Sequence, residues 1–168
     1  MLSKLKFHRN IAAFLNMSNE ELKQACENGN IGAVQLLLQD ERVDPSARDN
    51  HAICLASQEG HLEVVQLLLQ DERVDPSVKD NYAIRWASYE GHVEVVQLLL
   101  RYERVDPSSD NNWAIRWASR NGHKNVVDAL EHYRAEYKRK LLMVRLCMKR
   151  CHIYKDIRNL VVDEMRTC

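Results

Sequence analysis

The chain has 168 residues, 45% of them hydrophobic and 29% charged, and its 24 basic and 24 acidic side chains leave no net charge. These values are ordinary for a globular protein, and no segment approaches the roughly 18 consecutive apolar residues that a membrane-spanning helix needs. The five cysteines are odd in number and irregularly spaced, so they imply no disulfide framework and favour a reducing compartment. We therefore expect a cytoplasmic protein without a transmembrane segment.

The N-terminal segment, residues 1–16, is expected to form a partly ordered arm against the domain that follows. Its first six residues carry two lysines and no acid, but its longest apolar run, 11–15, is too short for the core of a secretory signal. A basic, amphipathic targeting segment of the mitochondrial type is the alternative.

A repeat of 31 residues organises the middle of the chain. The tripeptide Asp-Pro-Ser begins at Asp44 and recurs at Asp75 and Asp106. The same step separates four of the five glycines, which are Gly29, Gly60, Gly91 and Gly122. A fixed period of this length indicates a repeat architecture.

Each repeat is predicted to hold two helices joined by a tight turn. Residues 82–89 suit a short helix with small residues on one side, and Gly91 permits the positive-φ turn after it. Residues 93–100 are apolar nearly all round, as expected of a helix buried between neighbours. The following Asp-Pro is expected to stop that helix. Because no repeat can bury its second helix alone, the repeats are expected to stack as a solenoid.

These residues resemble the ankyrin repeat. Residues 60–69 are similar to the second helix of that family, and Ala56, Ala87 and Ala118 match the small residue near the end of its first helix. The resemblance covers roughly residues 18–133 and implies an all-α, ankyrin-type helical solenoid. The period of 31, against about 33 in the family, predicts short or absent β-hairpins. The Asp-Pro-Ser variant is similar to ankyrin proteins abundant in giant DNA viruses of protists.

The first helices depart from the family pattern. The family's Thr-Pro-Leu-His motif is replaced by segments that begin with His51, Tyr82 and Trp113. The capping threonine is therefore missing, and we expect N-capping by the asparagines just before these segments, which are Asn50, Asn81 and Asn112. The histidines His61, His92 and His123 recur beside the turn glycines and are expected to pack or cap.

The predicted domain organisation has three parts. After the arm of residues 1–16, an ankyrin repeat domain covers 17–136 with four repeats, about 17–43, 44–74, 75–105 and 106–136. Ser18 and Glu21 form a capping box at its start. A basic helical extension, 137–168, follows as a continuation of the last repeat.

The resemblance implies binding through the hairpin tips and the exposed face of the first helices. Positions that differ between repeats are free to serve a partner, and they are rich in Arg, Tyr and Trp, which dominate interface hot spots. We name these residues the first-helix patch: Arg48, Lys79, Tyr82, Arg85, Tyr89, Trp113, Arg116 and Arg120. Trp86 and Trp117 are instead expected to pack between repeats. An alternative is that Arg85 and Arg116 are ordinary solvated charges, paired with neighbours such as Glu90.

The C-terminal segment differs in charge from the repeats. Residues 134–158 hold nine basic and two acidic side chains, a net charge of +7, whereas residues 11–133 hold 11 basic and 20 acidic side chains, a net charge of −9. Four cations lie beside an apolar stripe of the expected helix, namely Arg134, Lys138, Arg145 and Lys149. Three roles remain open: capping the stack, docking a partner as an amphipathic helix, or contacting nucleic acid or an anionic membrane.

The sequence carries no motif for catalysis. It lacks a glycine-rich phosphate loop, a nucleophile elbow and a His-Glu metalloprotease motif, and Cys147, Cys151 and His152 lack a fourth zinc ligand. We expect no catalytic, cofactor-binding or metal-binding residues. The predicted function is a non-enzymatic, monomeric module that binds an unknown protein partner, a host protein under the viral interpretation, through the concave face. The alternative is a binder of nucleic acid or acidic surfaces through the basic helix.

Overall fold

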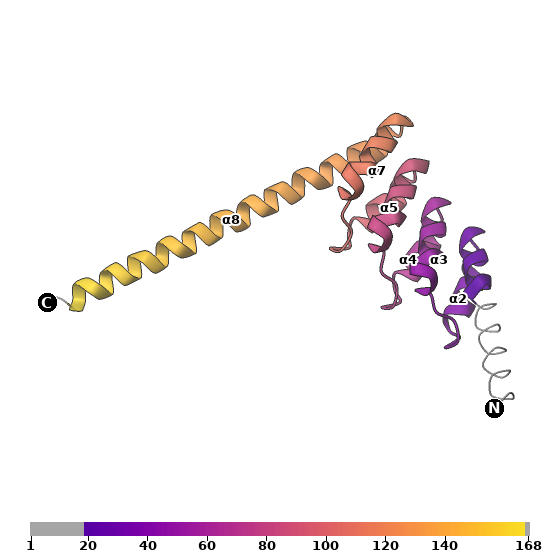
Figure 1. Cartoon of the computed structure of the whole chain (residues 1–168), viewed down its shortest axis with the longest axis horizontal. Helices are drawn as coiled ribbons and strands as arrows, with labels where there is room; N and C mark the ends of the chain where they lie inside the picture. Colours follow the sequence, from indigo (N-terminus) through magenta and orange to yellow (C-terminus); the bar gives the residue numbers. More distant parts are fainter. Residues whose placement is uncertain (1–18, 167–168) are drawn as a thin grey trace, which may run out of the picture. The chain divides into compact units, whose positions relative to one another are not determined.

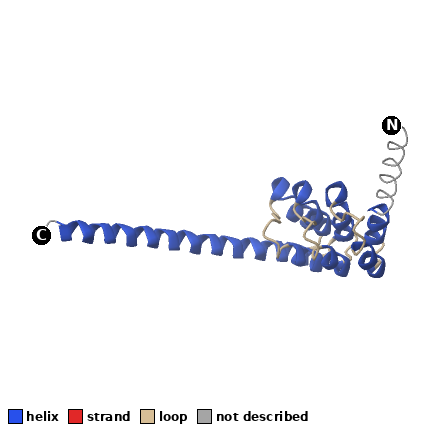
Figure 2. Ribbon diagram, turned by 90° about the horizontal axis from the view of Figure 1, so that it is seen from below, coloured by secondary structure: helices blue, strands red, loops and turns tan. Residues whose placement is uncertain are grey.

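The computed structural model describes the backbone of residues 19–166 and the side chains of residues 19–150. Within this part the chain consists of helices and connecting loops, with no strand (Figure 2). The predicted all-α class and the absence of β-hairpins are confirmed. The chain divides into two compact units, with the border between Leu130 and Glu131.

The first unit is built from helix pairs. Residues 19–27 form the first helix of the first pair. The first helices of the later pairs are α3 (Ala47–Gln58), α5 (Val78–Glu90) and α7 (Ser109–Arg120). The second helices are α2 (Ile31–Leu38), α4 (Leu62–Leu68), α6 (Val93–Leu99) and the start of α8 (Lys124–Arg166). First helices pack on first helices and second on second, which gives the two layers of a solenoid (Figure 1).

The core lies between these layers and is continuous along the stack. On the second helices it is made of branched side chains such as Val95, Val96 and Leu99, all fully buried. On the first helices the small Ala83 and Ala87 are also fully buried, which lets neighbouring repeats approach closely. Because each fully buried valine or leucine contributes about 1.5–3 kcal/mol, stacking supplies the stability that a single repeat lacks.

The Asp-Pro dipeptides are not what ends the second helices. Helix α6 ends at Leu99, one residue before the predicted end, and α2 ends at Leu38, well before Pro45, so the predicted extent is close and the role given to Asp-Pro is wrong. The last turn tightens because the N–H of Gln39 donates to the carbonyl of Leu36. Asp40 then accepts the N–H of Arg42 at 3.0 Å and turns the chain before the proline is reached.

A left-handed turn of three residues opens α3, α5 and α7. Arg48, Asp49 and Asn50 have φ of 54°, 58° and 57°, and the equivalent residues of α5 and α7 share this conformation. The expected N-capping by Asn50, Asn81 and Asn112 is wrong. The side chain of Asn81 accepts the N–H of Asp106 in the next repeat at 2.8 Å, and Asn50 accepts from Asp75 in the same way at 2.9 Å. Asparagine therefore joins repeats instead of starting its own helix.

The substitution Asp80→Gly tests the left-handed turn. Asp80 has φ of 55° and an exposed side chain, and a left-handed residue with a Cβ costs about 1–2 kcal/mol. We expect Asp80→Gly to be more stable than Asp80→Ala by about 1 kcal/mol in urea unfolding. Gln66 is exposed within the right-handed helix α4. There Gln66→Ala should be more stable than Gln66→Gly, because glycine costs about 1 kcal/mol relative to alanine inside a helix. The same order at both positions would contradict the left-handed conformation.

The recurring histidines connect each repeat to the one before it. His92 Nε2 lies 2.8 Å from the carbonyl oxygen of Gln58, and His61 and His123 repeat this contact at 3.0 and 2.9 Å. The tautomer that carries its proton on Nε2 donates to that carbonyl, which lies near the end of the preceding first helix. These side chains have the packing and capping role expected of them.

The second unit is the remainder of α8, which continues without a break to Arg166. The predicted helical extension of the last repeat is confirmed. Between Tyr137 and Met148 its large apolar side chains are exposed. Within the unit the ring of Tyr137 stacks on that of Tyr133, with the ring centroids 6.4 Å apart. No helix among the described residues combines the length and the apolar character needed to cross a bilayer.

Candidate protein-binding face

Five aromatic rings form a continuous cluster on α5 and α7. We name it the aromatic cluster, and its members are Tyr82, Trp86, Tyr89, Trp113 and Trp117. Spacings of three and four residues bring side chains to one helix face, and the packing of α5 on α7 brings the two faces together. Adjacent ring centroids lie 5.3 to 6.0 Å apart, in tilted and edge-on contacts. Every ring is partly exposed.

The two tryptophans left out of the first-helix patch belong to this cluster. Trp86 contacts Tyr82 and Tyr89 on its own helix and Trp113 on the next. The prediction that it packs between repeats is therefore confirmed, yet part of its ring remains open to a partner. The signal that could have found both tryptophans is their position four residues after Tyr82 and Trp113.

Arg85 is held firmly between two repeats. Its guanidinium lies 2.7 Å from the carboxylate of Asp110 and 4.8 Å from the centre of the Trp113 ring. The side chain is only 16% exposed, and its buried Nε has no hydrogen-bond partner. The alternative pairing with Glu90 is wrong, because the carboxylate comes from α7 of the next repeat.

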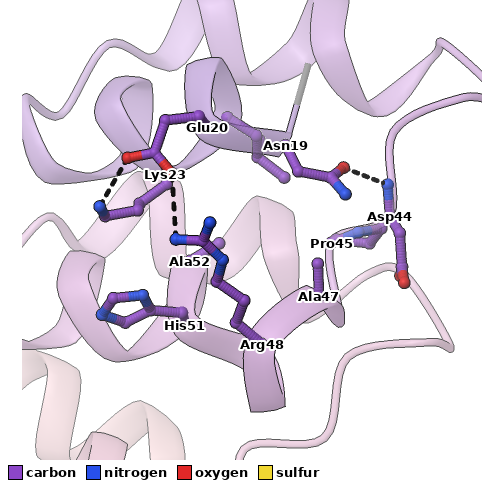
Figure 3. Close-up of a pocket in the computed structure, with 10 residues that line it drawn as sticks. Asn19, Glu20, Lys23, Asp44, Pro45, Ala47, Arg48, His51 and Ala52 are labelled. Carbon is purple, nitrogen blue, oxygen red and sulfur yellow. Dashed lines mark hydrogen bonds and ion pairs between the residues drawn. The ribbon is translucent and has the colours of Figure 1, made fainter. Parts of the chain in front are cut away.

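Two further cations of the first-helix patch also link repeats. Arg48 Nη1 lies 3.2 Å from Glu20, and Lys79 Nζ lies 3.3 Å from Asp49. Figure 3 shows Glu20 between Arg48 and Lys23, with Lys23 at 2.7 Å. The hydrogen bond from Lys23 is the main reason why the pKa of Glu20 is lowered. These cations are engaged within the stack.

A small hollow beside this contact contains His51. Its volume of about 40 Å³ has room for little more than water molecules, so it is too small for an organic ligand. Burial lowers the pKa of His51, and the positive charges of Lys23, Lys79 and Arg48 lower it further. The imidazole is therefore neutral at pH 7.

Arg116 and Arg120 are the cations of the first-helix patch that remain open. They lie one helical turn apart on α7, and both are exposed. Arg116 makes a long contact of 3.4 Å to the carbonyl of Asn111, and the Arg120 guanidinium lies 5.1 Å from the centre of the Trp117 ring. Neither has a carboxylate partner among residues 19–150.

Comparison with known families agrees with this geometry. A family model described as ankyrin repeats (3 copies) matches residues 16–80 and 53–140, which together exceed half of the chain. The chain belongs to the ankyrin-repeat family. Ankyrin repeats are generally protein-interaction modules, and the family is typically non-enzymatic. No curated protein matches the chain.

Among the described residues, no three His, Cys, Asp or Glu side chains are placed to hold a metal ion. Of the incomplete zinc-ligand set noted in the sequence, Cys147 is exposed, and the side chains of Cys151 and His152 lie outside the described residues. Arg134, Lys138, Arg145 and Lys149 are all exposed on α8.

Thiol labelling should distinguish the buried cysteines from the exposed one. Burial raises the pKa of Cys26 to about 12 and of Cys54 to about 11, whereas Cys147 is exposed. Because the thiolate is the reactive form, iodoacetamide should modify Cys147 in the native protein and leave the two buried thiols intact. Peptide mass spectrometry locates the adducts, with labelling in urea as the control. Equal modification of Cys54 and Cys147 in the native state would contradict the buried core position.

Proposed function

We propose that this protein binds a partner protein through the first-helix patch and the aromatic cluster, without catalysis. The observation that carries the proposal is the group of five partly exposed rings on two adjacent helices. Tyrosine, tryptophan and arginine contribute most to binding energy at protein interfaces. A specific interface needs about 800 Å² per partner. The first helices of several repeats together contribute to such an area.

The setting of this interaction is also a proposal. The similarity of the Asp-Pro-Ser repeats to viral ankyrin proteins supports a host protein as the partner and the cytoplasm as the place of binding. We propose that the protein is a monomer, because the stacked repeats together form one continuous core from Leu22 to Leu130.

A pull-down with matched variants tests the proposed function. The test variant combines Tyr82→Ala, Arg116→Ala and Arg120→Ala, and the control combines Glu63→Ala, Gln66→Ala and Gln97→Ala on exposed second-helix positions. Loss of a hot-spot residue costs about 2 kcal/mol or more, about thirtyfold in affinity. We expect quantitative mass spectrometry to show a partner lost with the test variant and kept with the control. The reverse pattern would place binding on the second helices.

The basic part of α8 supports a second candidate function. Of the nine large apolar side chains that are exposed among residues 19–150, seven lie between Tyr137 and Met148, among exposed cations. This combination suits binding of nucleic acid or another acidic surface. Fluorescence anisotropy with DNA should then show affinity that falls steeply between about 50 and 200 mM salt. Arg145→Glu with Lys149→Glu should abolish it, whereas DNA affinity that is absent or insensitive to salt would reject this function.

Deletion of residues 137–168 tests the remaining role of the extension. If α8 caps the ankyrin stack, the deletion lowers the midpoint of thermal unfolding followed by circular dichroism. An unchanged midpoint favours a binding arm.

A further inference from the structure

The charges of the first-helix patch are not equally available to a ligand. Arg48, Lys79 and Arg85 are each paired with a carboxylate of a neighbouring repeat. Arg116 and Arg120 have no such partner among the described residues. The free positive charge therefore lies at one end of the patch, on α7, where the Arg120 guanidinium lies over the ring of Trp117.

The geometry points to a partner of defined chemistry. We propose that the patch recognises an extended partner segment in which apolar or aromatic residues adjoin an acidic residue. The apolar residues pack on the aromatic cluster, and the acidic residue is bound by Arg116 and Arg120. This inference rests on the proposed function and adds the chemical class of its partner.

The two arginines suit a carboxylate. A guanidinium presents a planar fork of N–H donors that matches the two oxygens of Asp or Glu, and such charge-assisted bonds are about twice as strong as neutral ones. Residues four apart on a helix are neighbours, so Arg116 and Arg120 can approach the same ligand group. Glu90, at the end of α5, is exposed without an ion pair in the described part, which directs an acidic ligand toward α7.

Charge also excludes other partners. A basic segment would meet the uncompensated guanidinium groups of Arg116 and Arg120. A long polyanion such as nucleic acid would have to approach a stretch, residues 11–133, with a net charge of −9. A short apolar segment with one or two carboxylates avoids both penalties.

The chain carries its own reporter for this site. All three tryptophans, Trp86, Trp113 and Trp117, belong to the aromatic cluster. A ligand that packs on the cluster changes the environment of every tryptophan in the protein. Intrinsic tryptophan fluorescence therefore reports on this face alone.

Three synthetic peptides serve as probes in fluorescence titrations of the full chain. They share the core Leu-Phe-Pro-Leu and carry, on both sides, Asp-Glu, Ser-Ser or Lys-Arg. Hydrogen bonds to charged groups contribute about 1.5–3 kcal/mol each, so we expect the acidic peptide to bind at least tenfold more tightly than the neutral one. The basic peptide should bind most weakly.

Matched arginine variants assign the preference. Arg116→Gln with Arg120→Gln should bind the acidic and neutral peptides equally. Arg101→Gln, a change at an exposed arginine after α6, should keep the preference. Circular dichroism checks that each variant is folded, which the exposure of all three side chains favours.

The outcomes separate this inference from the proposed function. Equal binding of the acidic and neutral peptides, or tighter binding of the basic one, overturns the acidic preference. Binding of none of the peptides overturns recognition of a short segment. In each of these cases the proposed function still stands if the pull-down captures a partner with the intact protein and loses it with the test variant of Tyr82, Arg116 and Arg120. If no partner is captured either, both fail.

Discussion

Gly60→Ala is expected to lower the free energy of unfolding by about 2–3 kcal/mol, the sum of a left-handed backbone cost and a lost contact between repeats. Gly60 has φ of +75°, and an added Cβ would lie 2.6 Å from Cε1 and 2.7 Å from Cγ of His92. The imidazole must move, and its hydrogen bond to the Gln58 carbonyl is lost. The left-handed conformation alone costs a residue with a Cβ about 1–2 kcal/mol, and the loss of the part-buried hydrogen bond costs about 1 kcal/mol more.

Two other glycines separate these contributions in urea unfolding. Gly122 has φ of +79°, but its Cβ would meet nothing within 4 Å, so Gly122→Ala should cost only about 1–2 kcal/mol. Gly32 lies in α2, where an added Cβ would make only an ordinary contact of 3.8 Å to Asn30 Oδ1, so Gly32→Ala should stabilise by about 0.5–1 kcal/mol. Equal losses at Gly60 and Gly122 would show that the histidine contact adds nothing.

The period of the sequence predicts the fold because identical residues must occupy identical positions in a stack. The step between Gly60 and Gly91 predicts a turn, and the structure gives both glycines positive φ. The left-handed turn at Lys79, Asp80 and Asn81 could not be predicted in this way. It contains no glycine or proline, and the Asp106 N–H that bonds to Asn81 belongs to the next repeat. Local propensity carries no information about that distant contact.

The candidate site was predictable only in part for a similar reason. Comparing the repeats with one another located Tyr89 and Trp113, which lie in contact in the structure. The same comparison assigned both Arg48 and Arg116 to the first-helix patch, although Arg48 is paired with Glu20 and Arg116 has no carboxylate partner among the described residues. Whether an arginine is paired depends on which residues of the neighbouring repeat lie beside it. Aligning the repeats with one another compares equivalent positions and does not show these neighbours.

The asparagine contact between repeats gives the second large effect. Asn81 is 7% exposed, has φ of 61°, and accepts the N–H of Asp106 at 2.8 Å. Asn81→Ala leaves that N–H without its partner, which costs about 1–3 kcal/mol, and places alanine in a region that asparagine tolerates better. We expect a total loss of about 2–3 kcal/mol in urea unfolding.

Asn112 is the matched control, because it occupies the same position in the last repeat. It shares the left-handed conformation, with φ of 57° and ψ of 40°, but no Asp-Pro-Ser loop follows it. Asn112→Ala should therefore cost only the backbone part, about 1 kcal/mol. Because repeat proteins depend on contacts between neighbours, Asn81→Ala should also broaden the transition as repeats unfold separately. Equal losses at Asn81 and Asn112 would mean that helix packing, not this hydrogen bond, couples the repeats.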